Sequence, residues 1–491
     1  MGVPSLTLDA LLKDIVAPVP AELATVTPAD VALDSRLVEA GDLFVAVPGI
    51  DGDGRHFVEG ALGAGASSVL AEASDFESND PRVIAIPNLR AYCGLIARRF
   101  YRNPSSDMTL TAVTGTNGKT SVTDYIAQLL RLLGQPAGII GTLGSRLVSG
   151  EISDAVNTTP DIFTLSRTLD QWRDDSIQYV ALEASSHALA QHRLDGLSIH
   201  TGVFTNLTRD HLDYHGSIDA YCDAKLALFR DFDLAKAVYN ADDAMSAQVA
   251  SIAQCPALGI SLTDSSADIL VALEAEDSQG LRAKLHSPYG TEHLDLPLHG
   301  TFNAFNVAAA IATLVGMGFS FSELCSASHQ LHPVAGRMEL VGQGAVPRVV
   351  VDYAHTPDAL QRAMLGLRSS VSGKLWVVFG CGGDRDTGKR PIMGRIAEQY
   401  ADCVIVTNDN PRHESPQQIA EDIVSGCLES PAIQLDRAAA IHHAILNADD
   451  DDTILIAGKG HEPYQLVAGR RLPFSDGDVA QEALEIRGRG A

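Results

Sequence analysis

Cysteine is scarce in this 491-residue sequence, and no two cysteines have the spacing of metal ligands. The seven cysteines are scattered, their number is odd, and no CxxC motif occurs. This usage excludes a disulfide framework and a zinc ribbon, and it is typical of reduced thiols in a cytosol.

Basic residues are also few. The sequence has 36 Lys and Arg against 62 Asp and Glu, so its formal net charge is −26. Such a balance argues against nucleic acid and anionic membrane surfaces as partners. A small anionic substrate is still compatible with it, because a few local Lys and Arg side chains can build a positive cleft.

Long apolar runs are missing as well. The longest near-apolar run, Val307–Phe319, is too short to span a bilayer. The opening MGVPSLTLDALLKDIV has no basic segment before an apolar stretch, so we expect no signal peptide. These features predict a cytoplasmic protein without membrane insertion, and no obligate protein partner is indicated.

The sequence does contain enough apolar residues to form several hydrophobic cores. Hydrophobic residues make up 45% and charged residues 20%, and at roughly 150 residues per domain the length suggests about three domains. Strand-like runs alternate with helical patterns, which predicts an α/β fold. Polar boundaries near Tyr101–Asp107 and Pro333–Arg337 divide the chain into residues 1–107, 108–335 and 336–491.

Predicted strands occur in all three parts, and many are followed by polar or glycine-rich motifs. In parallel sheets the carboxyl ends of the strands are where ligands bind. A helix is predicted over Ser217–Phe229 and another over Asn303–Val315. The predicted strands are Leu43–Val47, Ser68–Ala71, Val83–Ile86, Thr109–Val113, Ile177–Leu182, Thr201–Thr205, Ala237–Tyr239, Arg348–Val351, Leu375–Phe379, Cys403–Thr407 and Thr453–Ala457.

The sharpest motif is GTNGKT, residues 115–120, between a strand and an amphipathic helix. Its glycines allow backbone N–H groups to approach phosphates, Lys119 can reach the β- and γ-phosphates, and the Thr120 hydroxyl can bind Mg²⁺. A GTPase, a kinase or a ligase can carry such a loop, but no NKxD motif for guanine is present.

Other polar residues follow nearby strands. Glu183 ends a predicted strand, where an acidic residue often holds Mg²⁺ near phosphate. His211 and His215 have the i,i+4 spacing of zinc ligands, but Gly216 argues for a loop and the HExxH glutamate is missing. From spacing alone these histidines are structural or solvent-facing, and Lys225 by itself is an ordinary surface lysine.

Taken together, the motifs resemble the Mur ligase family of cell-wall synthesis along nearly the whole chain. The first part matches most loosely. The motifs are GTNGKT, NTTP (157–160), EASSHALAQHR (183–193), TNLTRDHLDYH (205–215), Lys225 in YCDAKLALF, DYAHTPD (352–358), GCGGDRDTGKRP (380–391), DNPR (409–412) and GKGHE (458–462).

The resemblance implies a central P-loop ATPase-like domain with a parallel sheet, a Rossmann-like C-terminal domain and a smaller N-terminal α/β domain. It implies an ATP-dependent ligase that adds meso-diaminopimelate to a UDP-linked muramoyl dipeptide during peptidoglycan precursor synthesis. ATP is the co-substrate and Mg²⁺ the cofactor. The catalytic residues it implies are Lys119, Glu183, His211 and Lys225.

Residue roles follow from the same resemblance. Thr120, Glu183, His211 and Lys225 would bind Mg²⁺, with Lys225 carboxylated by CO₂ because an ammonium would repel the metal. The implied ATP-binding residues are Gly115, Thr116, Asn117, Gly118, Lys119, Thr120, Ser121, Asn303, Asn306, Arg337 and Asp352. The implied residues for the UDP-muramoyl dipeptide are Leu33, Ser35, Asn157, Thr158, Thr159, Ser185, Gln191 and Arg193.

The acceptor amino acid is assigned to the third part. Arg412 can pair with the distal carboxylate of diaminopimelate, which lysine lacks, and an acidic side chain can accept the distal ammonium. The implied diaminopimelate-binding residues are Arg385, Asp409, Asn410, Pro411, Arg412, Gly458 and Glu462.

Three rival interpretations stay open at this point. A lysine-adding ligase or a folyl-polyglutamate synthetase shares the ATPase core, although the latter has no counterpart of the first domain and of DNPR. A nucleotide-dependent switch would bind ATP without forming an amide. A catalytically inactive scaffold is opposed by the intact set of Lys119, Glu183, His211 and Lys225.

Overall fold

The computed structural model describes residues 6–16, 18–49, 52–147, 152–153, 157–277, 279–342, 344, 346–368 and 370–490. The chain forms two compact units. The first comprises Met1–Thr114, Gly134–Gly202 and Ala227–Ala235, and the second comprises Gly115–Leu133, Val203–Leu226 and Lys236–Ala491. Among the described residues, no helix is long and apolar enough to cross a membrane.

The first unit begins with a small parallel sheet. Its four strands lie in the order β1-β2-β3-β4, and Phe44, Val58 and Val69 are buried in its core. The strands are β1 (Val31–Ala32), β2 (Leu43–Ala46), β3 (Ser68–Glu72) and β4 (Val83–Ile86), and the helices are α1 (Leu8–Leu11), α2 (Ala21–Ala24), α3 (Val58–Gly63) and α4 (Leu89–Phe100).

The remainder of the first unit contains a second set of strands in the order β5-β9-β6-β7-β8. The strands β5, β9 and β6 are parallel, whereas β7 and β8 are antiparallel. The elements are β5 (Thr109–Thr114), β6 (Ala137–Gly141), β7 (Gly144–Leu147), β8 (Ile152–Ser153), α6 (Ile162–Asp174), β9 (Tyr179–Glu183) and α7 (Ser186–Ala190). The chain crosses between the units within β10 (Thr201–Phe204).

The segment Tyr101–Asp107, predicted as a polar boundary between two parts of the chain, is packed against its surroundings. Tyr101 is only 2% exposed, and the Ser105 hydroxyl accepts a hydrogen bond of 2.9 Å from the Ser198 amide. Its turn residues form a short 3₁₀ helix at Pro104–Asp107. The turn-type residues of this segment therefore form an ordered connection.

The second unit contains the phosphate-loop helix and a further set of strands. Strands β11, β12 and β13 are parallel, and β13, β14 and β15 form an antiparallel meander. The elements are α5 (Lys119–Leu132), α8 (Leu212–His215), α9 (Ile218–Arg230), β11 (Lys236–Asn240), α10 (Ser246–Ile252), β12 (Ala257–Ser261), β13 (Ile269–Asp277), β14 (Gly280–Ser287), β15 (Gly290–Leu296), α11 (Thr301–Gly316) and α12 (Phe321–Ala327).

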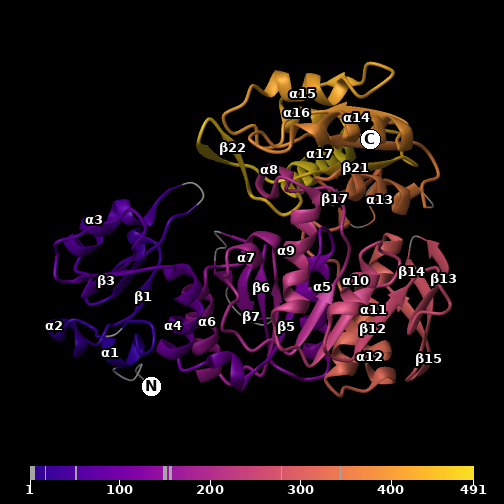
Figure 1. Cartoon of the computed structure of the whole chain (residues 1–491). Helices are drawn as coiled ribbons and strands as arrows, with labels where there is room; N and C mark the ends of the chain where they lie inside the picture. The colour runs from indigo at the N-terminus through magenta and orange to yellow at the C-terminus, as the bar shows by residue number, and fades with distance from the viewer. Residues whose placement is uncertain are drawn as a thin grey trace. The chain divides into compact units, whose positions relative to one another are not determined.

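The C-terminal part of this unit is a sheet with helices on both faces (Figure 1). Its strand order is β16-β17-β21-β18-β19-β20, and the strands from β17 to β20 are parallel. The strands of this sheet are β16 (Glu339–Val341), β17 (Arg348–Asp352), β18 (Leu375–Phe379), β19 (Cys403–Val406), β20 (Ala432–Ile433) and β21 (Thr453–Ala457). A separate antiparallel pair is formed by β22 (Tyr464–Val467) and β23 (Arg470–Pro473).

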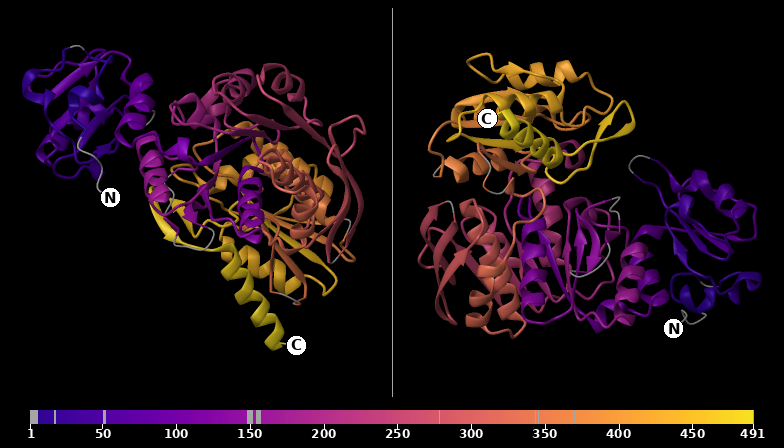
Figure 2. Two further views of the ribbon diagram at one scale, coloured as in Figure 1. Left: turned by 90° about the horizontal axis from the view of Figure 1, so that it is seen from below. Right: turned by 180° about the vertical axis from the view of Figure 1, so that it is seen from behind.

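One face of this sheet packs on α13 (Pro357–Arg368), α14 (Arg390–Tyr400) and α15 (Pro416–Val424). The other face packs on α16 (Arg437–Asn447) and α17 (Asp476–Gly490). Figure 2 shows α17 in yellow as the last helix before the C-terminus. The carboxyl ends of β17, β21, β18 and β19 consequently lie along one edge, and each precedes a predicted motif.

Candidate functional site

The phosphate loop follows β5 and leads into α5, which begins at Lys119. Gly115 and Gly118 have φ angles of 146° and 88°, a region that favours glycine. A Cβ on Gly115 would lie 1.9 Å from the Thr205 Oγ1 atom. The loop therefore needs glycine both for its backbone conformation and for its close approach to Thr205.

The segment that follows β10 forms hydrogen bonds with the phosphate loop. The Thr205 hydroxyl donates to the Asn117 carbonyl at 2.5 Å, and the Asn117 amide donates to the Asn206 side chain at 2.9 Å. The Thr116 hydroxyl lies 3.1 Å from the Tyr221 hydroxyl. These bonds fix the loop in place before any ligand binds, which is what phosphate binding by backbone N–H groups requires.

Two lysines converge on the loop. Lys119 Nζ donates to the carbonyls of Gly115 and Thr116, each at 2.9 Å. Lys225, on α9, donates to the same Gly115 carbonyl at 2.7 Å and is 1% exposed. Burial, together with the charge of Lys119, holds the pKa of Lys225 well below its usual value. Lys225 is therefore a buried amine whose neutral form is more accessible than that of an exposed lysine.

His211 lies beside an acidic residue. Its Nε2 atom is 3.3 Å from the Asp210 carboxylate, and the His355 Nε2 atom lies 3.6 Å from the same group. Burial alone would raise the pKa of Asp210, but His355, His211 and Lys389 together hold it well below its usual range. The predicted loop around His215 is wrong in detail, because Leu212–His215 form a single helical turn that ends at Gly216.

The C-terminal part of the second unit contributes Arg337 to the phosphate loop. Arg337 Nη2 donates to the Thr120 hydroxyl at 3.0 Å, and its guanidinium lies 4.2 Å from the centre of the Tyr353 ring. Asp352 ends β17 and accepts from the amides of Met338 and Ala354 at 2.7 and 2.8 Å. Burial raises the pKa of Asp352, and the two hydrogen bonds that Asp352 accepts organise the backbone beside Arg337.

Asn303 and Asn306 lie on α11 and are 2% and 4% exposed. Asn306 donates to the Asn303 side chain at 3.1 Å, and the Tyr125 hydroxyl donates to the same oxygen at 3.3 Å. A Cβ on Gly118 would lie 2.9 Å from the Asn306 Oδ1 atom. These amides therefore join α11 to α5, on which Ser121 is also buried.

In the first unit, Glu183 stands at the end of β9 and is 1% exposed. Its two carboxylate oxygens accept from the Thr142 amide at 2.8 Å and from the Thr142 hydroxyl at 3.1 Å. The Thr142 hydroxyl also bonds the Thr158 hydroxyl at 3.2 Å. Glu183 is thus tied to the NTTP motif through Thr142.

Several residues assigned to the muramoyl dipeptide gather at the same place. The Thr159 hydroxyl donates to the Glu183 carbonyl at 2.6 Å and lies 3.1 Å from the Ser185 hydroxyl. Arg193 donates to the Thr159 carbonyl at 2.8 Å and to the Gln191 side chain at 2.7 Å. The Arg193 cation is therefore fixed next to Thr159, whose hydroxyl lies near that of Ser185, and such a cation suits an anionic ligand. Asn157 is exposed.

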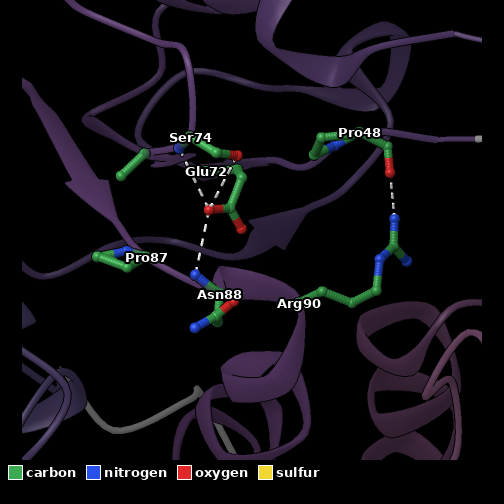
Figure 3. A pocket seen from close by; sticks show the side chains of 7 residues that line it. Pro48, Glu72, Ser74, Pro87, Asn88 and Arg90 are labelled. Carbon is green, nitrogen blue, oxygen red and sulfur yellow. Dashed lines mark hydrogen bonds between the residues drawn. The ribbon is translucent and has the colours of Figure 1, made fainter.

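Leu33 and Ser35 follow β1 in the small sheet. Asp34 between them caps the 3₁₀ turn Ser35–Leu37 and pairs with Arg36. An open pocket of about 520 Å³ lies at the carboxyl ends of β2, β3 and β4 in the same sheet (Figure 3). Glu72 accepts the Asn88 and Leu89 amides there at 3.1 and 2.9 Å, and Arg90 donates to the Pro48 carbonyl.

The acceptor motifs lie together at the carboxyl edge of the C-terminal sheet. Asn410 donates to Glu462 at 2.8 Å, and Lys459 donates to Asn410 and Glu462 at 3.1 and 2.8 Å. A Cβ on Gly458 would lie 2.6 Å from the Asp409 carboxylate. The loops after β19 and β21 therefore form one polar cluster.

Two arginines complete this edge. Arg412, with a φ of 51°, donates from Nη1 to the Gly383 carbonyl at 2.7 Å. Pro411 is buried, and Arg385 is half exposed. Burial and the nearby Arg385 charge lower the pKa of Arg412, while Asp409 and Glu462 oppose that shift. Cationic and anionic groups thus face one region, which matches a zwitterionic amino acid.

Sequence reasoning missed Lys459 and Thr142. Lys459 is completely buried, and the signal was its place inside GKGHE, directly after a buried strand. Thr142 follows β6 at the same type of strand end as Glu183. Within the described ranges, no three His, Cys, Asp or Glu side chains gather as a group that could hold a metal. A Mg²⁺ site here would need other oxygen donors, such as a hydroxyl or a lysine carbamate.

Comparison with known proteins identifies similar chains. Residues 29–101 match the profile of the Mur ligase family, catalytic domain; residues 113–314 match the Mur ligase middle domain; and residues 336–460 match the Mur ligase, glutamate ligase domain. The chain is 44% identical over 468 residues to the UDP-N-acetylmuramoyl-L-alanyl-D-glutamate–2,6-diaminopimelate ligase of Chromobacterium violaceum, covering 94% of each chain.

Solved structures agree with these matches. A structure of UDP-N-acetylmuramoyl-L-alanyl-D-glutamate–2,6-diaminopimelate ligase is similar with a TM-score of 0.70 and 35% identity over 99% of both chains. The MurF ligase of Thermotoga maritima in complex with ADP has a TM-score of 0.68 at 19% identity, covering 94% of this chain and 98% of that one. The second likeness concerns the fold alone.

Proposed function

The chain belongs to the Mur ligase family, and from that premise we propose that it is the ATP-dependent ligase that adds meso-diaminopimelate to UDP-N-acetylmuramoyl-L-alanyl-D-glutamate. The observation that carries this assignment is the whole-length similarity to the Chromobacterium violaceum enzyme. The reaction belongs to cytoplasmic peptidoglycan precursor synthesis. The domains that we propose for this chain are residues 1–107, 108–335 and 336–491.

The reaction has two steps. The γ-phosphoryl group of ATP moves to the glutamate carboxylate of the UDP substrate, which gives an acyl phosphate and ADP. The amine of diaminopimelate then attacks the acyl carbon, and phosphate leaves as the amide forms. Phosphoryl transfer depends mainly on positioning and charge neutralisation, so the charged residues around the phosphate loop are the ones to assign.

ATP is assigned to the second unit. Its phosphates bind the N–H groups of residues 115–120, and Lys119 neutralises their charge. Arg337, which already reaches Thr120 at 3.0 Å, supplies a second cation near the phosphates. Asn303, Asn306 and Asp352 act by holding α11, the loop and the backbone near Arg337 in place.

Mg²⁺ is assigned to Thr120, Glu183, His211 and Lys225, and when bound it neutralises phosphate charge. Lys225 fits this role only after it becomes a carbamate. Carbamate formation by CO₂ requires a neutral amine, and the lowered pKa of Lys225 favours that form. The carbamate then offers oxygen donors of the kind that Mg²⁺ prefers.

The UDP substrate is assigned to the first unit. Arg193, Thr159 and Ser185 receive the dipeptide end near Glu183, together with Asn157, Thr158 and Gln191. Leu33 and Ser35 lie by the UDP end, at the sheet edge that also carries the pocket of Figure 3. This edge is the usual ligand side of a parallel sheet.

Diaminopimelate is assigned to the polar cluster of the C-terminal sheet. Arg412 and Arg385 pair with its distal carboxylate, and Asp409 and Glu462 accept its distal ammonium. Asn410, Pro411 and Gly458 shape the loops. A lysine substrate would leave Arg412 without its anion, and this favours diaminopimelate over lysine.

The test is an ATP-dependent phosphate-release assay with UDP-muramoyl dipeptide and a panel of amino acids, coupled to mass detection of the amide. We expect turnover with meso-diaminopimelate and little with lysine. Preferential use of lysine would replace the assignment with the lysine-adding activity. ATP binding without amide product would favour a nucleotide-dependent switch.

A further inference from the structure

Arg437 is a completely enclosed arginine that no step of the proposed reaction uses. It is the first residue of α16, yet it is only 1% exposed. Its guanidinium pairs with both carboxylate oxygens of Asp476, each at 2.7 Å. Asp476 is the first residue of α17 and is 0% exposed. The pair therefore joins the starts of two helices that cover the same face of the C-terminal sheet.

The remaining donors of Arg437 reach two backbone carbonyls. Nη1 donates to the Asn408 carbonyl at 3.1 Å, and Nη2 donates to the Ala457 carbonyl at 3.0 Å. Asn408 directly precedes Asp409, and Ala457 is the last residue of β21, directly before Gly458. The Arg437 side chain thus bonds the starts of both loops, after β19 and after β21, that carry the residues assigned to diaminopimelate.

The sheet itself does not connect the starts of these two loops. In the strand order, β18 separates β21 from β19, so no ladder hydrogen bond runs between the strands that carry the loops. Asn410, Lys459 and Glu462 join the loops at their tips. Arg437 joins them at their bases, from a position buried beneath the ligand side.

The charge of Arg437 acts on the same cluster. Burial alone would lower its pKa, but Asp476, Asp409 and Glu462 outweigh burial and raise it. Arg437 therefore remains a cation beneath two acidic side chains assigned to the amino acid. A guanidinium can satisfy a carboxylate and two separate carbonyls at once because its donors form a rigid planar fork, which an ammonium lacks.

We propose that Arg437, oriented by Asp476, is a positioning residue for the incoming amino acid, because it sets the loop 408–412 relative to the loop 458–462. This inference rests on the proposed function and deepens it. The ligand must touch both loops at once, so a shift of one loop base misplaces half of its contacts. The alternative is that the buried Arg437–Asp476 ion pair only stabilises the fold.

Three variants separate positioning from stability. Arg437→Lys keeps the charge but loses the fork. The double variant Arg437→Met with Asp476→Leu removes the whole pair, and such apolar replacements often leave stability unchanged. Arg348→Met is the matched control, since Arg348 starts β17 at the opposite end of the strands and donates to Ser370 at 2.8 Å.

Steady-state phosphate release gives KM for each of the three substrates, and thermal unfolding gives stability. In both Arg437 variants, we expect KM for diaminopimelate to rise about ten- to hundredfold, with KM for ATP and for the UDP substrate changing by less than about twofold. The double variant should keep this defect even where its Tm matches the wild type. Arg348→Met should change Tm without changing any KM.

An unchanged KM for diaminopimelate in a folded Arg437→Lys protein would overturn the inference. So would an equal rise of all three KM values in either variant. If the double variant does not fold, the lysine variant decides alone. A wild-type protein without diaminopimelate-dependent turnover would instead reject the proposed function, and the inference would fall with it.

Discussion

Lys225 is the residue whose ordinary chemistry the fold changes most. Its amine is buried against the Gly115 carbonyl, and its pKa lies well below the usual 10.5. In CO₂-free buffer, burial of this amine therefore costs stability at every pH below 10.5, where the unfolded lysine is protonated and the folded one resists protonation. The wild type should therefore lose stability as pH falls from about 10 to about 7, whereas Lys225→Met has no such amine. The Tm of Lys225→Met minus that of the wild type should rise over this range. A constant difference in Tm across that range would contradict a depressed pKa.

Substitutions of Lys225 should also change turnover. Lys225→Arg should be nearly inactive, because a guanidinium cannot form a carbamate and would repel Mg²⁺. Lys225→Ala should also fail, and a small added carboxylate should partly restore turnover by occupying the vacated space. The measurement is phosphate release with and without the carboxylate. Normal turnover of the arginine variant would reject the carbamate.

Lys119 tests the ATP assignment. Its Nζ donates to the loop carbonyls of Gly115 and Thr116, each at 2.9 Å, and its side chain is not part of a hydrophobic core. Lys119→Ala should remain folded and lose about 100- to 1,000-fold in kcat, as when one preorganised charge-stabilising donor is removed. Circular dichroism confirms folding and phosphate release measures the loss. Near-wild-type turnover would remove ATP from this loop.

Arg412 tests the choice of amino acid. Removing one partner of a desolvated charge pair costs about 2–5 kcal/mol, or roughly 30-fold to a few thousand-fold, and the lower end applies because the neighbouring Arg385 is half exposed. Arg412→Asn should therefore lose most diaminopimelate activity and little of any lysine activity. The measurement is kcat/KM for both amino acids in both proteins. An equal loss for the two would show that Arg412 does not read the distal carboxylate.

At the scale of elements, α6 presents the NTTP motif. Asp161 caps this helix by accepting from the amides of Phe163 and Thr164 at 3.0 and 3.2 Å, and Thr158 and Thr159 lie just before the cap. Asp161→Ala should lower the free energy of unfolding by about 1 kcal/mol and raise KM for the UDP substrate more than KM for ATP. Urea unfolding and steady-state kinetics check both parts. Unchanged stability would mean that the cap is not needed.

Elements with one dominant signal were predictable from the sequence. The strands Leu375–Phe379 and Thr453–Ala457 are apolar on both faces because helices cover the sheet on each side, and their predicted bounds are confirmed. The strands β13, β14 and β15 were missed. Their buried residues are interrupted by more exposed ones, and β13 contains a bulge between Leu273 and Ala275, so no continuous apolar run marks them.

Within the candidate site, motif residues were predictable and their supports were not. Lys459 and Thr142 act through residues that are distant in sequence, since Lys459 bonds Asn410 and Thr142 bonds Glu183. Arg437 gives even less signal, because an arginine at a helix start is ordinarily exposed. Only the sheet order, which places β19 and β21 on either side of β18, makes its position meaningful.

At the scale of the whole molecule, the proposed reaction would use the C-terminal region and the phosphate loop together. Arg337 lies between β16 and the end of α12 in sequence, yet it hydrogen-bonds Thr120 at 3.0 Å. Thr120 is also assigned to Mg²⁺, so this contact must rearrange when nucleotide and metal bind. Arg337 can then turn its charge from the hydroxyl to the phosphates, provided that the C-terminal region stays near the loop.

A charge-assisted bond to phosphate is stronger than the present bond to a neutral hydroxyl, so an ATP analogue with Mg²⁺ and the UDP substrate should keep the C-terminal region at the loop for more of the time in solution. Small-angle scattering should show a smaller radius of gyration with both ligands than with neither, because the phosphate charge attracts Arg337. Arg337→Met should weaken the compaction, while Arg348→Met, which changes an arginine at the far end of β17, should preserve it. Identical scattering curves with and without ligands would mean that the phosphates do not draw the C-terminal region inward, and Arg337 would then be a fixed part of the loop's surroundings.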